Sequence, residues 1–336
     1  MWPRWAEPLR GTLTFLAPLT RLLRRGQTAG PSLSATRHPT PAAASVASAA
    51  ATLAERMPDL LLQAQRASAS LAAGQHQQHR AGWGETFWQY RPAQPGEPAS
   101  HIDWRQSARS THAQVREQEA ESARTILLWC DFSASMQWRS DTAHAYKLDS
   151  AILLLLTMAG LLLRAGERVR LLGPDGPVAL PPTGPALERL AIGLTRLATT
   201  ASATPHPALP PTGHLPRHAH ILIASDFLCP DDALNTCLRQ IASSPARAHL
   251  IHIMDPAEID LPYQGRVLFT GLEGEPAVEL SETQDIRQDY ARLVSAYQER
   301  LSQSAVRHGH DSVQHRTDSA PLPSLLALHA LMGRHA

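Results

Sequence analysis

Apolar residues follow two alternating patterns through the middle of the chain, one typical of buried strands and the other of helices. Short, continuous apolar runs predict strands at residues 125–130, 168–172, 220–224 and 249–254. Apolar residues at helical spacing predict helices between them, at residues 147–165, 186–198 and 231–242. Strands that are apolar on both faces and alternate with helices are typical of a mostly parallel sheet covered by helices. We therefore predict an α/β fold, a doubly wound sheet with helices on both faces.

The sequence on either side of this region is less regular, and it divides the chain into further parts. We expect a basic, low-complexity extension and linker over residues 1–50, a helix and an irregular arm rich in Gly, Trp and Arg over 51–120, the α/β domain over 121–260, and C-terminal elements that complete this domain over 261–336. Within these parts, apolar spacing predicts a helix at 52–73, a strand at 266–270, and helices at 285–308 and 322–332.

Charge and composition exclude several classes of protein. The net charge of +1 gives no general attraction to nucleic acid or to a membrane surface. Lys147 is the only lysine, and no glycine-rich pattern precedes it, which excludes a P-loop nucleotide-binding protein. The 3 cysteines have neither paired nor zinc-like spacing, as is typical of a reducing compartment.

The N-terminal residues are basic but do not resemble a signal peptide. Six arginines precede residue 40, and Pro8, Gly11 and Pro18 interrupt the apolar residues among them. Two interpretations remain open, a poorly ordered basic extension and a short helix that contacts a membrane surface. The apolar run at 151–163 is too short to span a bilayer of about 30 Å. We therefore expect no transmembrane segment and a cytoplasmic protein.

Polar side chains follow two of the predicted strands directly. The sequence LLWCDFSASM places Asp131, Ser133 and Ser135 after the first strand, and ILIASDF places Ser225 and Asp226 after the third. Because ligands of parallel sheets bind at the carboxyl ends of the strands, we expect these side chains to lie close together. Their oxygen atoms are the ligands that Mg²⁺ or Mn²⁺ prefers, and sulfur and imidazole are missing, which disfavours zinc.

Three interpretations of these residues remain open. The first is a metal-dependent adhesion site, in which the serines bind the cation directly and one coordination position accepts a partner's carboxylate. The second is a hydrolase in which Asp131 is the nucleophile. Enzymes of that kind usually place an acid two residues further on, where this chain has Ser133, which cannot donate a proton at neutral pH. The third is a set of helix caps that binds no metal.

Two stretches of the chain resemble known families. DFSASM and ASDF resemble the von Willebrand factor type A domain. GWGETFWQYRPAQPGEPASHIDWRQSARSTHAQVREQEAE resembles the signature of the bacterial "domain of unknown function 58" family, and this resemblance runs from about Leu53 to the C-terminus. Members of that family are commonly encoded beside AAA+ ATPases of the MoxR type. The resemblance implies a non-enzymatic, metal-assisted protein-interaction module, a partner or adaptor of such an ATPase in the assembly or maturation of protein complexes.

The resemblance also implies a set of metal ligands. Asp131, Ser133 and Ser135 match the first metal motif of the type A domain, and Asp226 matches the last. Its middle motif is a threonine, for which we choose Thr183, while Thr212 is the alternative. The glycine usual between the two serines is Ala134 in this chain.

The arm motif HIDWRQSAR has two interpretations. Asp103, Trp104, Arg105 and Arg109 form a contact patch for a partner protein, or they anchor the arm. In the second interpretation Asp103 pairs with an arginine and Trp104 packs beneath the sheet. We favour the anchoring role.

Overall fold

The structure of the protein is a computed structural model. The chain divides into two compact units. One unit comprises residues 1–69 and 124–336, and the other comprises residues 70–123. The structure describes residues 43–78, 87–93, 102–118, 124–201, 207–213, 215–265, 267–269, 278–280 and 283–334.

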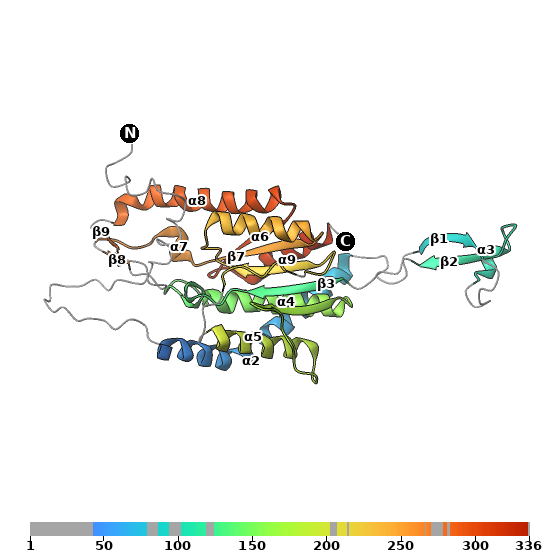
Figure 1. The fold of residues 1–336 in the computed structure, drawn as a ribbon, viewed down its shortest axis with the longest axis horizontal. Coiled ribbons are helices and arrows are strands. Elements are labelled where there is room, and N and C mark those ends of the chain that lie inside the picture. Colours follow the sequence, from blue (N-terminus) through green and yellow to red (C-terminus); the bar gives the residue numbers. More distant parts are fainter. Residues whose placement is uncertain are drawn as a thin grey trace. The chain divides into compact units, whose positions relative to one another are not determined.

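The larger unit is built on a sheet whose strands lie in the order β10-β7-β6-β3-β4-β5. Figure 1 labels two of these strands, β3 and β7. The strands are β3 (Thr125–Cys130), β4 (Arg168–Gly173), β5 (Gly176–Pro177), β6 (His220–Ser225), β7 (Arg247–Met254) and β10 (Asp311–Arg316). All neighbours pair in parallel except β5, which turns back antiparallel to β4. The predicted doubly wound, mostly parallel sheet is therefore confirmed.

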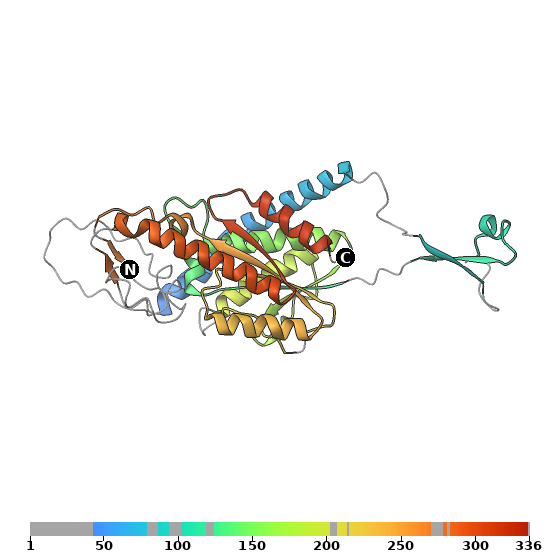
Figure 2. The same cartoon turned by 90° about the horizontal axis from the view of Figure 1, so that it is seen from above.

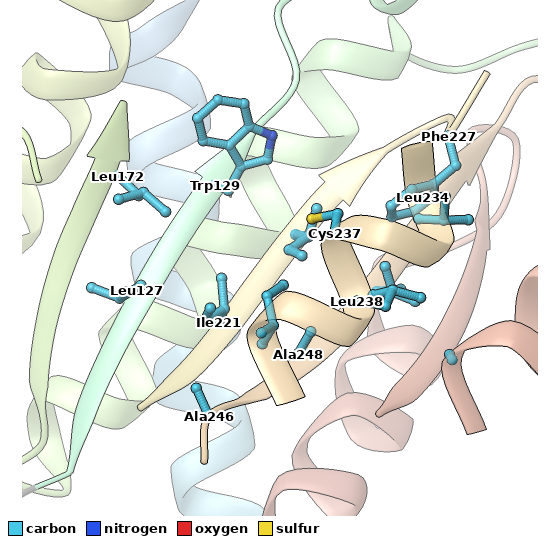
Figure 3. Close-up of a cluster of buried hydrophobic side chains, with 14 of the residues drawn as sticks. Leu127, Trp129, Leu172, Ile221, Phe227, Leu234, Cys237, Leu238, Ala246 and Ala248 are labelled. Carbon is cyan, nitrogen blue, oxygen red and sulfur yellow. The ribbon is translucent and has the colours of Figure 1, made fainter. Parts of the chain in front are cut away.

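Alternate residues of the central strands face the two helical layers. Leu127 and Trp129 of β3 pack with α6 (Asp231–Ser243) and with Leu301 of α8 (Thr283–Arg307). Figure 3 shows Leu234, Cys237 and Leu238 of α6 lying over the strands of this face. The opposite face is covered by α4 (Lys147–Arg164), α5 (Ala186–Ala201) and α9 (Pro321–Gly333). Burial of both faces explains why β3 and β6 have continuous apolar sequences.

The helix α2 (Ala43–Gln78) adds a further layer on the outside of α4. Figure 1 shows the blue part of this helix beside α5 and below α4, and Figure 2 shows the same part from above. Gly160 of α4 permits this close contact, because a Cβ atom added there would lie 3.0 Å from Oγ of Ser68. Arg56 also donates to Asp149 of α4 at 2.6 Å. These contacts place residues 43–69 of the helix with the α/β unit, although we expected residues 51–69 to belong with the arm.

Short elements cover the carboxyl ends of the strands. The helix α7 (Pro256–Asp260) follows β7 directly, and Asp255 caps it in a capping box with Glu258. A hairpin of β8 (Val267–Phe269) and β9 (Val278–Leu280) packs with Tyr290 and Val294 of α8. Among the described residues, no helix combines the length and the apolar character needed to cross a membrane.

The smaller unit is a β-ribbon with a short helix. The strands β1 (Phe87–Pro92) and β2 (Gln114–Gln118) pair antiparallel. The helix α3 (Trp104–Ser107) precedes β2, and Asp103 is its N-cap.

Most elements predicted from periodicity in the larger unit are present, with ends that differ by a few residues. The helix α2 begins at Ala43, inside the segment expected to be a linker, because its alanine-rich sequence favours helix. The edge strand β10 was not predicted. Its sequence DSVQHR is mostly polar, since only one of its neighbouring positions is occupied by another strand.

Candidate metal centre

The candidate site lies where the order of the strands reverses. The chain passes from β3 to β4 on one side, and then returns to place β6 on the other side of β3. In sheets of this kind, the crevice at such a switch point is the usual place for a ligand. Asp131 follows β3 and Asp226 follows β6, so both carboxylates lie at this crevice.

The loop after β3 brings its polar groups together. The Ser133 N–H donates to Oδ1 of Asp131 at 2.8 Å, and the hydroxyl oxygens of Ser133 and Ser135 are 2.9 Å apart. Ala134 begins a 3₁₀ helix, η3 (Ala134–Gln137), and has no positive φ angle. Alanine therefore suits this position, where the type A domain usually has glycine. The structure thus brings together Asp131, Ser133 and Ser135, as predicted.

The loop after β6 completes the cluster. The Ser225 hydroxyl donates to Oδ2 of Asp131 at 2.7 Å, which joins the two loops. The side chain of Ser135 adds to the effect of Lys147 in lowering the pKa of Asp226, and the Leu228 N–H donates to Oδ1 of Asp226 at 3.1 Å. Asp226 therefore lies beside the serines, as predicted.

Phe227 gives this second loop an unusual backbone. Its φ of 53° is in the left-handed region, which is unfavourable for a residue with a large side chain. The side chain of Phe227 is fully buried, and the hydroxyl of Tyr297 in α8 donates to its carbonyl oxygen at 2.5 Å. These contacts hold the loop in the conformation that presents Asp226 to the crevice.

A buried ion-pair network adjoins Asp226. Lys147, at the start of α4, has no solvent exposure. Its ammonium donates to Oδ2 of Asp226 at 2.8 Å and to Oε1 of Glu258 at 2.6 Å. The only lysine of the chain thus joins the first turn of α4 to the end of β6 and to α7.

The pKa values of these groups reflect burial and mutual charge. Burial opposes the charge on Lys147, but the carboxylates of Asp226 and Glu258 outweigh it and hold the pKa of the ammonium above its usual value. Burial would likewise raise the pKa of Asp226, but Lys147 holds it below its usual range. Burial, followed by the charge of Asp226, raises the pKa of Asp131 to about 7. Burial also raises the pKa of Glu258, to about 7, although Lys147 opposes this.

The charges of this region do not balance when every group is ionised. Asp131, Asp226 and Glu258 are each at most 5 % exposed, and among the described residues the cation that pairs with Asp226 and Glu258 is Lys147. Three carboxylates and one ammonium carry a net charge of −2, which is costly in a buried site. Either protons or a divalent cation would neutralise it. The donor set of two carboxylates and two hydroxyls suits Mg²⁺ or Mn²⁺.

Ser133 is the most exposed member of this donor set. It is partly exposed, whereas Asp131 and Ser135 are buried. The described residues contain no group of three or more His, Cys, Asp or Glu side chains suited to a metal ion. A site here therefore depends on the serine hydroxyls.

Neither threonine candidate is placed in this cluster by the described contacts. Thr183 is exposed in the loop that leads into α5, and Leu187 in the first turn of α5 lies beside Gly160. Gly160 is 13 residues along α4 from Lys147, a distance of about 20 Å at 1.5 Å per residue. Thr212 instead donates to Oε1 of Gln240 in α6, at 2.5 Å.

The arm residues lie in the smaller unit. Asp103 caps α3, where its carboxylate accepts from the N–H groups of Arg105 and Gln106, both at 3.1 Å. Trp104 is 64 % exposed, so its indole does not contribute to a core within the described part of this unit. The packing by which we expected Trp104 to anchor the arm is therefore not found there. Arg105 and Arg109 are also exposed.

Sequence analysis missed Lys147 and Glu258 as parts of the site, and it placed Ser225 at the end of its strand without counting it among the metal ligands. Glu258 had a usable signal, because DPAE after a strand is a capping-box sequence with proline at the first helical position. Lys147 also had a usable sequence signal, because a single lysine directly before a long apolar helix is unusual. Their pairing joins positions that are 79 and 111 residues apart, which no local pattern reveals.

Comparison with known proteins identifies related sequences. Residues 89–300 match the family model described as "Protein of unknown function DUF58", and this range includes all the residues of the cluster. Similar curated sequences include an uncharacterized protein of Mycobacterium bovis and two of Mycobacterium tuberculosis. Each is 29% identical over 236 residues, which cover 67% of this chain and 72% of the relative.

Proposed function

The chain belongs to the DUF58 family, and from the geometry of its sheet edge we propose that it is a metal-assisted protein-interaction module without enzymatic activity. Asp131, Ser133, Ser135 and Asp226 would hold Mg²⁺ or Mn²⁺. The bound cation would supply a Lewis-acidic position for a carboxylate of the partner. The partner we propose is an AAA+ ATPase of the MoxR type, in the assembly or maturation of protein complexes.

The observation that carries this proposal is the uncompensated negative charge beside the paired hydroxyls. Lys147 neutralises only one of the three buried carboxylates, while Ser133 and Ser135 place two neutral oxygen donors beside Asp131 and Asp226. Small, hard divalent cations favour such a set of oxygen atoms. The partial exposure of Ser133 supports access by a partner.

The arrangement does not favour hydrolysis with Asp131 as the nucleophile. Both of its carboxylate oxygens accept hydrogen bonds, from the Ser133 N–H and from the Ser225 hydroxyl. Asp131 is also fully buried, which disfavours direct contact between its carboxylate and a phosphoester. We therefore expect the purified chain to show no metal-dependent hydrolysis of generic phosphoesters or esters.

The test of this function is a quantitative pull-down of the purified ATPase in Mg²⁺. We expect the double variant Ser133→Ala with Ser135→Ala to capture at least about tenfold less ATPase than wild type, because it lacks both neutral donors. Removing the ion with EDTA should have the same effect on wild type and little further effect on the double variant.

Two controls make this test specific. The nucleotide state of the ATPase is fixed with a non-hydrolysable analogue, because the ATPase itself uses Mg²⁺. Ser243→Ala, a serine on the exposed end of α6, serves as the matched variant and should bind as wild type does. Equal capture by wild type and the double variant would refute the metal-assisted mechanism.

A further inference from the structure

The tip of the β-ribbon in the smaller unit has features of a protein-binding surface. Trp104 is 64 % exposed, a larger fraction than for any other aromatic side chain among the described residues whose exposure is known. Arg105 and Arg109 are exposed on the same turn. Tryptophan and arginine are the side chains that most often dominate the energy of protein interfaces.

The backbone beneath these side chains is held by a closed set of hydrogen bonds. The Ser107 hydroxyl donates to the carbonyl oxygen of Asp103 at 2.7 Å and accepts from the Gln114 N–H at 2.8 Å. The Asp103 N–H donates to the carbonyl oxygen of Gln114, also at 2.8 Å. A short helix is thereby tied to the start of β2. A preformed surface loses little conformational entropy on binding, which favours affinity.

The charges on this tip favour an acidic partner. The carboxylate of Asp103 accepts from backbone N–H groups of its own turn. Neither Arg105 nor Arg109 forms an ion pair within the part of the chain that the structure describes. Exposed guanidinium groups that form no ion pair bind carboxylates well. Two of them beside an indole therefore match an apolar pocket that is bordered by acidic side chains.

Nucleic acid also binds surfaces that combine aromatic and basic side chains, but the composition of this unit disfavours it. Residues 70–123 contain 5 arginines and 6 acidic residues, so the unit lacks the excess of positive charge that contact with a phosphate backbone requires.

We propose that Trp104, Arg105 and Arg109 form a second docking surface, which inserts the indole into an apolar pocket bordered by carboxylates on the partner protein. The inference rests on the proposed function, since the partner is the same AAA+ ATPase. It adds a contact that needs no metal, and it assigns to the arm a recognition role in place of the anchoring role expected from the sequence.

The experiment measures the affinity of the full chain for the purified ATPase, in Mg²⁺ and with the nucleotide fixed. Trp104→Ala should weaken binding by about thirty-fold or more, as is typical of a central aromatic contact. Arg105→Glu with Arg109→Glu should weaken it by at least about tenfold and reduce its dependence on salt. Leu326→Ala and Arg164→Glu are matched controls, because they change an exposed leucine and an exposed arginine of the larger unit, and both should bind within about twofold of wild type.

Each outcome decides between distinct conclusions. Binding by both arm variants within about twofold of wild type overturns this inference and leaves the metal site unaffected. If the arm variants lose binding and the two serine changes have no effect, the docking surface on the arm is supported and the metal-assisted mechanism is refuted. Failure of the wild-type chain to bind the ATPase overturns both proposals. Tight binding of a 20-nucleotide poly-dT probe that is lost in Trp104→Ala overturns the protein partner in favour of nucleic acid.

Discussion

Replacing Lys147 with methionine should lower the free energy of unfolding by about 3–5 kcal/mol, the usual effect of removing one partner from a buried ion pair. Methionine is similar in length and uncharged, so the change leaves Asp226 and Glu258 buried without their counter-ion. Urea unfolding at pH 8, in EDTA, measures this effect. In that condition no divalent cation is available to replace the ammonium.

Two further variants isolate the cause of this loss. Arg164→Met removes an exposed cation from the other end of the same helix and should change stability by less than about 0.5 kcal/mol. Lys147→Met with Glu258→Gln should be more stable than Lys147→Met alone, because one of the unpaired charges is gone. A loss below about 1 kcal/mol for Lys147→Met would show that the network does not stabilise the fold.

Replacing Asp131 with asparagine should abolish the stabilisation of the protein by Mg²⁺. For wild type we expect about 2.7 kcal/mol when the cation is in hundredfold excess over its dissociation constant. Asparagine retains the shape of Asp131 and one of its two acceptor oxygens, but it lacks the charge that a hard cation requires. Thermal unfolding with and without Mg²⁺, supported by calorimetric titration, measures the difference.

When the cation is absent, Asp131→Asn should not lower the stability of the protein at alkaline pH. Because the pKa of Asp131 is raised to about 7, its contribution to stability is present at pH 4 and is lost as the pH rises through 7. In EDTA at pH 8, Asp131→Asn should therefore be at least as stable as wild type. Equal stabilisation of both proteins by Mg²⁺ would place any cation site elsewhere.

The helices and strands that could be predicted from the sequence are those whose residues are buried along nearly the whole element. The strands β3 and β6 and the helix α4 are apolar along nearly their whole length, because each lies between other layers of the fold. The edge strand β10 is half exposed, and its polar sequence gives no comparable signal. Its parallel pairing with β7 depends on contacts between residues more than 60 positions apart.

The site was predictable in part for a similar reason. Asp131, Ser133, Ser135 and Asp226 follow strands directly, so the position of each strand fixes the position of its polar residues. Thr183 could not be placed in this way, because the hairpin of β4 and β5 turns the chain back before α5 begins. The exposure of Trp104 was also beyond sequence analysis, since a large aromatic residue is as typical of a core as of an interface.

The most direct test of the metal site is an anomalous diffraction measurement on crystals of the full chain grown with Mn²⁺. We expect a single strong anomalous peak between Asp131, Ser133, Ser135 and Asp226, within about 2.2 Å of both serine hydroxyls. Crystals of Ser133→Ala with Ser135→Ala should lack it. A map of the wild-type protein without a peak at this position, at a Mn²⁺ concentration that saturates any calorimetric binding, would contradict the proposed metal site.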